Sequence, residues 1–344
     1  MKKILCFLFT ITVFLNSALV SGDFLYRAQD VGTLSKDASE ARSLNQKGSV
    51  VGKYWMGEYC HDFLWVPKMG LLTINENSDP RSYPALNNYN EVLGVIFESS
   101  GFNFLKSYSV QQYFYSFQTG KKTRGNKMLL GIGEPPMLYE IKRFNDNRDR
   151  LYHFSLRLSA TLKSTLIQSD YAPYLVELWH ILRMNEYMEM LVVSPAKALL
   201  KILDKDQELI AEVSDNPLSG IALNDMRDVI ATNPNATEGF FWSFKDHMKG
   251  ETALISLGSF IPTALNNHGE IVGKLLSASN EENRSFWLRK RDGTMIELNE
   301  AIDFNGMAVE KILETWAIND RGQILISASL DGKRTAFLLN PIQD

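Results

Sequence analysis

Short apolar runs separated by one recurring polar turn make up most of this chain. The clearest copy is the segment Thr263–Gly273, where the apolar residues Ala264 and Leu265 precede a polar Asn-Asn-His-Gly run, and Ile271 and Val272 come shortly after it. Two apolar runs on either side of a turn that contains Asn and Gly are typical of a β-hairpin. The segment therefore predicts a strand, a tight turn and a second strand.

The same hairpin pattern occurs seven times along the chain. Each copy is anchored by an Asn that follows an apolar residue, and these are Asn45, Asn87, Asn145, Asn185, Asn224, Asn266 and Asn319, at intervals of 42, 58, 40, 39, 42 and 53 residues. Three positions after the Asn, four copies have Gly or Asn, which suit a turn with positive φ, whereas the others have Arg148, Met188 and Arg227. The copies at Asn145 and Asn185 fit the pattern least well.

Most copies continue into a third apolar run, such as Phe63–Trp65 or Phe286–Leu288, and several into a fourth, such as Leu71–Ile74. Four short strands in about 40 residues is the period of a β-propeller blade. Because one four-stranded sheet cannot cover both of its apolar faces, neighbouring sheets must stack. We therefore expect an all-β fold, with residues 23–344 forming a single β-propeller domain of seven four-stranded blades.

The two ends of the mature chain complement each other. The last copy stops at Leu339–Asp344 without a fourth run, and the segment Phe24–Val31 supplies a spare strand before the first copy begins. Pairing this N-terminal strand into the last blade would remove an exposed sheet edge. The pattern predicts a ring that the N-terminal strand closes.

Four segments together resemble the HAF-type extracellular repeat, namely Asp30–Leu34, Ser43–Gly52, Phe63–Trp65 and Ala264–Gly273. The resemblance extends over copies one, two, five, six and seven. It implies an exported bacterial protein built of propeller-like repeats. It brings no catalytic residues to this chain.

Residues 1–22 have the features of a signal peptide. Lys2 and Lys3 precede an apolar run, Ile4–Leu15, and small residues at Val20–Gly22 offer a cleavage site. The apolar run is too short to span a membrane and Asn16 interrupts it. We expect an exported protein, periplasmic or extracellular, with no integral membrane span after cleavage.

Charge and cysteine content narrow the range of partners. The net charge is −4, and loss of Lys2 and Lys3 leaves 34 basic against 40 acidic residues, a net charge of −6. Nucleic acid is therefore not an expected partner, because phosphate binding requires a basic surface. Cys60 is the only cysteine beyond residue 22, so the mature chain has no internal disulfide.

The chain contains no evident catalytic or metal-binding motif. Its five histidines are scattered without the spacing of metal ligands, and no cofactor is expected. The triplet Cys60–Asp62 places a nucleophile next to a base. Adjacent residues on a strand face opposite ways, however, so the two side chains would not meet. The triplet also precedes the Phe63 strand, as a turn would. The recurring Asn has two interpretations. In the first interpretation the Asn side chains form a ring of amides around a channel. In the second, each Asn side chain bonds the backbone of its own turn, and we favour this second interpretation.

The longest interval, between copies two and three, is the best candidate for a binding loop. Insertions in repeat folds map to loops on one face, where binding residues concentrate. The candidate binding residues in this interval are Phe102, Phe104, Tyr108, Lys121, Lys122 and Arg124. The last three belong to an expected basic turn, whereas Tyr113–Phe117 is better explained as a strand that packs against the next blade.

These features favour an exported binding module without a catalytic centre, whose partner is a protein or a glycan. The alternative is a hydrolase or lyase that acts on glycan or peptide with acidic residues from several blades, by analogy with other propellers. A structural surface protein is the third interpretation. Carboxylates that converge in the mouth of the channel would distinguish the enzyme from the binding module.

Overall fold

The structure is a computed structural model. It describes residues 24–32, 37–76, 78–80, 82–100, 107–132, 138–144, 146, 150–156, 162–168, 173–175, 180–193, 199–206, 208–276 and 285–342. The predicted signal peptide lies outside the described residues. The chain is all-β, and its strands form separate antiparallel sheets that follow one another along the sequence.

Six sheets each consist of four consecutive strands in sequential order. The first three are β2 (Ala38–Leu44), β3 (Val50–Met56), β4 (Tyr59–Val66) and β5 (Gly70–Asn75); β6 (Ala85–Leu86), β7 (Glu91–Ser100), β8 (Ser107–Ser116) and β9 (Lys121–Ile132); and β10 (Leu138–Phe144), β11 (Arg150–Leu156), β12 (Leu162–Gln168) and β13 (Pro173–Leu175). The next three are β14 (His180–Met184), β15 (Met190–Val193), β16 (Leu200–Leu203) and β17 (Leu209–Glu212); β18 (Ser219–Leu223), β19 (Val229–Thr232), β20 (Gly239–Trp242) and β21 (Leu254–Gly258); and β22 (Phe260–Leu265), β23 (Ile271–Leu275), β24 (Ser285–Arg289) and β25 (Met295–Glu297).

The last sheet joins the two ends of the chain. Its order is β26 (Ile302–Asp303), β1 (Tyr26–Asp30), β29 (Lys333–Pro341), β28 (Ile324–Leu330) and β27 (Val309–Ile318). The N-terminal strand β1 pairs antiparallel with β29, as the sequence predicts. The sequence did not predict β26, which pairs parallel with the other edge of β1 and follows the short helix α3 (Leu298–Ala301). The interval of 53 residues between Asn266 and Asn319 thus supplies a strand that covers the edge of β1.

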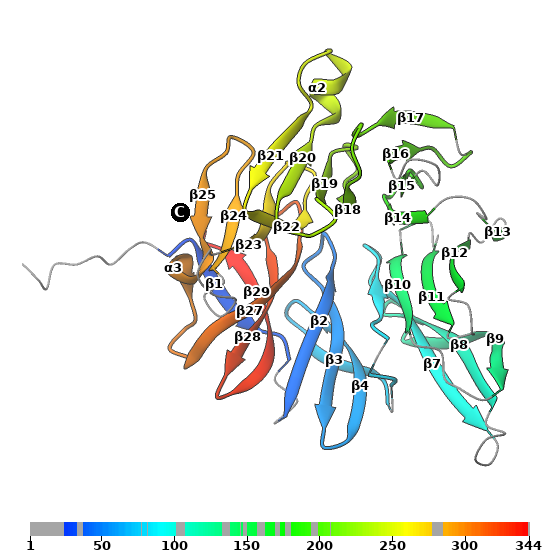
Figure 1. Ribbon diagram of the computed structural model, residues 1–344. Helices are drawn as coiled ribbons and strands as arrows, with labels where there is room; N and C mark the ends of the chain where they lie inside the picture. The colour runs from blue at the N-terminus through cyan, green and yellow to red at the C-terminus, as the bar shows by residue number, and fades with distance from the viewer. Residues whose placement is uncertain are drawn as a thin grey trace, which may run out of the picture.

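The sheets are arranged around a common centre (Figure 1), and one edge strand of each sheet lies on the inside. The innermost strands are β2, β6, β10, β14, β18, β22 and β27, and each contacts the innermost strand of the next sheet. The contacts include one between β27 and β2, which are the last and the first of these innermost strands in chain order. This radial stacking of four-stranded sheets is the arrangement of a β-propeller.

The predicted hairpin turn joins the first strand of each sheet to the second. Gly48, Gly269 and Gly322 have positive φ there, and so does Asn90. Met188 and Arg227, the poor fits to the sequence pattern, also adopt positive φ, at 62° and 66°. The hydrogen bonds of the turn therefore outweigh the strain of a left-handed backbone at a residue with a side chain.

A β-bulge accompanies the turn. In six sheets the pairing of the first two strands shifts by one residue at the same distance before the Asn, as between Ala41 and Ser43 or between Pro262 and Ala264. A bulge bends its strand and increases its twist. The repeated bulge thus bends six of the innermost strands as they approach the central turns.

The core lies between adjacent sheets. The aliphatic position two residues after the polar turn is fully buried wherever its burial is described, at Val51, Leu93, Leu191, Ile230, Val272 and Leu325. Val272 packs with Phe286 and Leu288 of its own sheet and with Ile324 and Ile326 of the next. The hairpin pattern thus also identifies residues that hold neighbouring sheets together.

Two expectations about local structure were wrong. Lys121, Lys122 and Arg124 were expected in a basic turn, but they lie in β9, because the long interval is largely absorbed by the long strands β7 to β9. Cys60–Asp62 was expected to be a turn before the Phe63 strand, but it lies inside β4 and pairs with β3. In both places added residues lengthen a hairpin instead of forming a loop.

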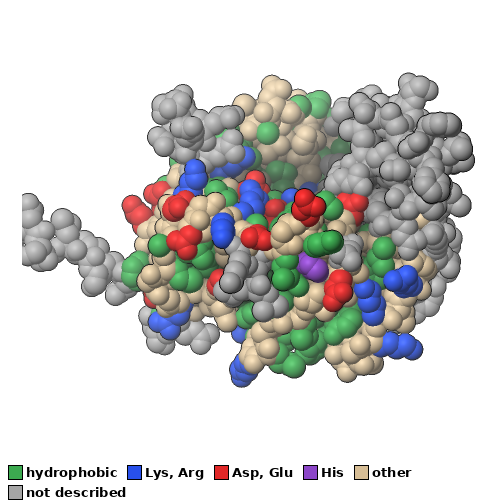
Figure 2. Space-filling view, turned by 90° about the horizontal axis from the view of Figure 1, so that it is seen from below, with side chains coloured by type: hydrophobic (Ala, Val, Ile, Leu, Met, Phe, Trp, Pro, Cys, Tyr) green, Lys and Arg blue, Asp and Glu red, His purple; other side chains and the backbone are tan. Residues whose placement is uncertain are grey.

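Few helices are present. Among the described residues α2 (Phe244–Met248) and α3 are short, and no helix has the length and apolar character needed to cross a membrane. On the face drawn in Figure 2, Lys and Arg side chains are intermixed with Asp, Glu and hydrophobic side chains. Among the described side chains drawn on that face, no extended basic patch is visible.

We expect Val272→Asp to destabilise the protein by about 3 kcal/mol or more, because a carboxylate would be buried without a partner between two sheets. Ile255→Asp in β21 is the matched control, since Ile255 is 40% exposed. Chemical denaturation of both variants measures the difference. Equal stability of the two variants would contradict the inward placement of Val272.

Candidate functional site

A small polar cavity lies where hairpin turns of six sheets meet. Its volume is about 100 Å³. Its lining consists of the apolar residue before the turn, the Asn and the residue after it, from several sheets: Leu44, Asn45, Gln46, Leu86, Asn87, Asn88, Glu186, Leu223, Asn224, Asp225, Leu265, Asn266, Asn267, Ile318, Asn319 and Asp320. The recurring sequence pattern therefore builds one central site.

Among the described copies, the Asn side chain bonds its own turn and, in five of them, the next turn as well. In Asn266, Oδ1 accepts hydrogen bonds from the backbone N–H groups of His268 (3.1 Å) and Glu270 (2.9 Å). Its Nδ2 donates to the Glu270 carboxylate (2.8 Å) and to the backbone carbonyl of Asn319 in the next sheet (3.1 Å). The same bond to the next Asn carbonyl is made by Asn45, Asn185, Asn224 and Asn319. The turn interpretation is thus correct, and it omits the contact between sheets.

The residue after each Asn forms a second set of contacts, which runs around the whole centre. Its backbone N–H donates to a side-chain oxygen of the equivalent residue in the next sheet, over 2.7 to 2.9 Å. In order, the residues are Gln46, Asn88, Asp146, Glu186, Asp225, Asn267 and Asp320, and the Asp320 N–H donates back to Gln46. The seven bonds form a closed cycle.

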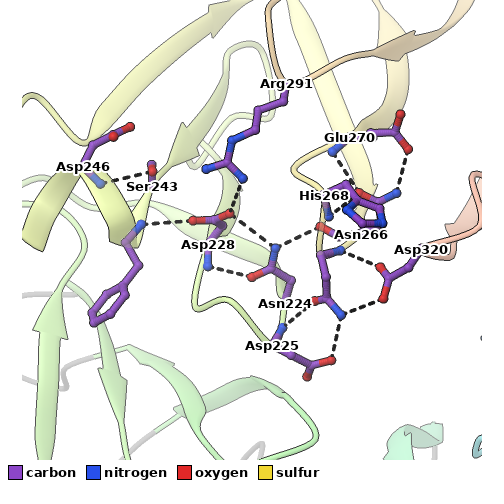
Figure 3. Close-up of polar contacts among 12 residues, drawn as sticks. Asn224, Asp225, Asp228, Ser243, Asp246, Asn266, His268, Glu270, Arg291 and Asp320 are labelled. Carbon is purple, nitrogen blue, oxygen red and sulfur yellow. Dashed lines mark hydrogen bonds and ion pairs between the residues drawn. The ribbon is translucent and has the colours of Figure 1, made fainter.

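Four of these seven residues are acidic, so carboxylates do converge at the centre. The Asp225 and Asp320 carboxylates, both labelled in Figure 3, accept from the Asn267 side-chain amide at 3.0 and 2.9 Å. Asp146 accepts from both the backbone and the side-chain N–H of Asn88. The carboxylates therefore act as acceptors that join neighbouring turns.

Farther from the centre, the residue four positions after the Asn varies between copies. Asp228 is buried, and it accepts from the backbone N–H of Phe244 at 3.1 Å and lies 3.7 Å from the Arg291 guanidinium (Figure 3). Burial raises the pKa of Asp228 above its usual value, and these two contacts oppose the shift. At the equivalent position Glu189 binds Arg227 (2.7 Å). These groups support the turns from outside.

The residue two positions after each Asn is exposed, and its chemistry differs between copies. The described members of this set are Lys47, Tyr89, Tyr187, Met226, His268 and Arg321. Tyr89, Tyr187 and Met226 are 49%, 67% and 58% exposed. Each turn therefore presents a buried Asn, a half-buried polar residue and an exposed variable residue, in that order.

A second polar cluster, between the first two sheets, was not predicted. Lys53 is fully buried and pairs with Asp62 (3.1 Å), and it donates to Ser78 (2.7 Å). Tyr113 donates to the other Asp62 oxygen (2.7 Å), and a Cβ at Gly94 would lie 2.2 Å from its ring. Burial, with Asp62 beside it, raises the pKa of Tyr113. The cluster is enclosed, so it acts as a polar contact between sheets.

Cys60 and His61 do not form a nucleophile and base. The Cys60 thiol is buried and lies 3.9 Å from the Lys53 ammonium, whereas His61 stacks on the Tyr54 ring. Burial raises the pKa of Cys60 to about 11, although Lys53 opposes the shift. A thiol of this kind carries little thiolate at neutral pH and is a poor nucleophile. Among the described residues no group of three or more His, Cys, Asp or Glu side chains is placed to bind a metal ion.

The predicted binding residues do not lie at the central cavity where they can be described. Phe102 and Phe104 lie outside the described residues, and Tyr108 is in β8. Lys121, Lys122 and Arg124 are exposed on β9. The Lys122 ammonium donates to Asn75 (2.7 Å) and lies 4.5 Å from the Tyr113 ring, and burial lowers its pKa. Their role in binding stays a prediction.

The central cycle could have been found in the sequence. The residue after the anchoring Asn is Gln, Asn, Asp or Glu in all seven copies, including the two poorest ones. An amide or carboxylate at one position of every repeat indicates a shared acceptor. The Lys53 and Asp62 pair has no such signal, because its members come from one sheet and occur once.

No family model and no curated protein matches the chain. Among solved structures, it is similar to virginiamycin B lyase from Staphylococcus aureus, with 8% identity over 92% of this chain and 100% of that chain and a TM-score of 0.49. It is also similar to the β-propeller domain of the Trilobed protease from Pyrococcus furiosus, with 12% identity over 91% of this chain and 85% of that chain and a TM-score of 0.35.

A third similar structure is the acylaminoacyl peptidase from Pyrococcus horikoshii, with 12% identity over 92% of this chain and a TM-score of 0.39. This chain spans about half of that one, 47% of its length. At these identities and TM-scores the similarities carry no conclusion about activity or ligand.

We expect Asn266→Ala to destabilise the protein by roughly 1–3 kcal/mol, because two backbone N–H groups lose their acceptor and one bond between sheets is lost. Asn216→Ala, at an exposed position between β17 and β18, is the control. Thermal and chemical denaturation compare the two. If both variants melt like the parent protein, the Asn side chains do not hold the turns together.

Proposed function

We propose that the sheets form a closed propeller of seven blades. Three observations support closure, and each involves the first and last parts of the chain. The innermost strands β27 and β2 are in contact, β1 pairs with β29, and Asn319 and Asp320 bond to Asn45 and Gln46. The N-terminal strand supplies the fourth strand of the last sheet, whose outer edge would otherwise end at β29.

On this scaffold the chain acts as an exported binding module without a catalytic centre of its own. One observation carries this proposal. Within each turn the buried Asn and the half-buried acceptor keep their type, whereas the exposed residue beside them changes from basic to aromatic to apolar. A repeat that only stabilises the ring needs no such variety at its exposed position, and binding residues are found on exposed loops of rigid scaffolds.

The converging carboxylates favour one alternative, a hydrolase or lyase that acts on glycan or peptide. Glu186, Asp225 and Asp320 line one cavity, as such an enzyme requires. Two features favour the binding module. The carboxylates join neighbouring turns by accepting their N–H groups, and the cavity of about 100 Å³ is well below the ordinary 300–1,000 Å³ of small-molecule pockets.

Export is part of the same proposal. The n-region, the apolar run and the small residues before Asp23 support it, and so does the resemblance of the repeats to the HAF type. The single cysteine of the mature chain fits a protein held together by its core and its ring of turns.

Deletion of residues 24–31 tests closure. We expect a loss of several kcal/mol and a lower melting temperature, because β29 would lose its neighbour and Tyr26 and Ala28 would leave the core. The double variant Phe24→Ser and Leu25→Ser is the control, since both side chains are about half exposed. A deletion variant that melts like the control would show that β1 does not close the fold.

Photo-crosslinking tests the binding module. A photoreactive amino acid at position 89, 187 or 226 should give discrete adducts in the producing cell, because these side chains are exposed around the central site. The same amino acid at positions 59 and 209, on exposed residues away from the turns, should give none. The absence of adducts from all three turn positions would refute binding through this face.

A further inference from the structure

The β-bulge before the central turn leaves one unpaired residue on the innermost strand. In β2 the pairing with β3 passes from Ala41 to Ser43, so Arg42 between them has no partner on β3. In β27 the pairing with β28 skips Trp316 in the same way. Bulges take a side chain out of the regular alternation of a strand and often re-aim it beside a site. Arg42 and Trp316 therefore hold equivalent places on two adjacent innermost strands.

The guanidinium of Arg42 lies over two aromatic rings. Its Cζ atom is 3.8 Å from the ring centroid of Tyr83, which precedes β6 of the second sheet, and 4.4 Å from that of Trp316 in the last sheet. Both rings are themselves bonded, because the Trp316 indole N–H donates to Ser327 (2.9 Å) and the Tyr83 hydroxyl bonds to Glu40. A guanidinium stacked on fixed rings loses little further freedom when it binds a ligand.

One carboxylate serves two guanidinium groups at this place. Glu40 is buried, and its Oε1 accepts from the Arg42 Nε (2.8 Å) while its Oε2 lies 3.3 Å from the Arg334 Nη1. Burial and the charge of Glu40 raise the pKa of Tyr83, so the phenol keeps its proton and adds no negative charge. Among the described residues Glu40 is the only carboxylate that forms an ion pair with either arginine. Two cations therefore share one anion.

The outer end of the Arg42 guanidinium is left without an acceptor. Glu40 uses Nε, and within the described part of the chain nothing accepts a hydrogen bond from Nη1 or Nη2. The side chain keeps 36% of its surface exposed even though it is stacked and paired. The parallel N–H groups of a guanidinium match the two oxygens of a carboxylate, and such charge-assisted pairs are among the strong hydrogen bonds.

This arginine is separate from the cavity at the central turns. Leu44 and Ile318, which directly precede the Asn of their turns, line that cavity, whereas Arg42 and Trp316 do not. The two bulge residues come two positions earlier on the same strands, which is roughly 7 Å along a β-strand. A ligand on Arg42 would therefore bind farther along the innermost strands than the exposed residues of the turns.

We propose that Arg42 is a binding site for the carboxylate group of a small organic acid, such as the free end of a peptide or a uronic acid. The Nη1 and Nη2 groups donate to the two carboxylate oxygens. Glu40, Tyr83 and Trp316 hold the guanidinium in place, and Arg334 supplies the excess positive charge. The site goes beyond the proposed binding through the turn residues and does not depend on it.

Two matched pairs of probes test the site on the full chain, with binding followed by ligand-observed NMR. N-acetyl-diglycine is compared with its C-terminal amide, and methyl glucuronide with methyl glucoside. Binding is expected for the carboxylate member of at least one pair and for neither neutral member, and it should weaken as salt is added. The pair that binds distinguishes a peptide end from a uronic acid.

Arg42→Gln should lower the affinity of the carboxylate probe roughly tenfold or more, the loss expected when charge-assisted hydrogen bonds are removed. Arg42→Lys keeps the charge but loses the parallel donors, so it should also weaken binding. Arg27→Gln is the matched control and should bind like the parent protein, because Arg27 is 63% exposed on β1 and pairs with Asp303. Thermal denaturation of each variant shows that it is folded.

Equal binding of the charged and neutral members of both pairs, or no binding of either carboxylate, would overturn the proposal. So would a folded Arg42→Gln variant that binds like Arg27→Gln, since Arg42 would then only join neighbouring sheets. If Arg42→Gln does not fold, the comparison of probes on the parent protein and the Arg42→Lys variant decides. None of these results changes the outcome of crosslinking at the turn positions, so the two proposals fail separately.

Discussion

The arrangement of this protein depends on a single repeated contact, in which a backbone N–H of one turn meets a side-chain oxygen of the next. Seven such bonds return to their starting point at Gln46. Each hydrogen bond between partly buried groups adds only about 1 kcal/mol to the stability of the fold. A buried donor or acceptor that is left without a partner costs more than that. Because every turn both donates and accepts, loss of one sheet would leave two turns unsatisfied. The cycle therefore favours one specific number of sheets.

The seven hairpins, the buried aliphatic position and the pairing of the N-terminal strand could be read from the sequence, because each follows from short-range periodicity. The turns at Met188 and Arg227 were judged weak by their residue type, yet both adopt the same positive φ as the Gly turns. Asn185 and Asn224 bond the backbone of those turns through their side chains and so hold that conformation. Side-chain hydrogen bonds within the turn outweighed the conformational preference of the single residue there.

The local structure of the candidate binding residues was predicted less well than the fold. The aromatic and basic residues of the longest interval predicted a basic turn that contains Lys121 and Arg124. Both residues lie instead on an extended strand at the edge of the second sheet. The exposed residues of the central turns, such as Tyr187, come from separate repeats. A pattern along one chain shows what repeats, and it does not show which exposed residues of different repeats come to share a face.

Native-state hydrogen exchange of the seven amides of the central cycle tests the account most directly. A closed ring predicts that the amide of Asp320, whose N–H donates to the Gln46 side chain at the closing link, exchanges as slowly as those of Asp225 and Asn267 within the chain. Fast exchange at Asp320, at a rate near that of an exposed turn amide, with protection retained at Asp225 and Asn267, would show that the ring is open between the last sheet and the first.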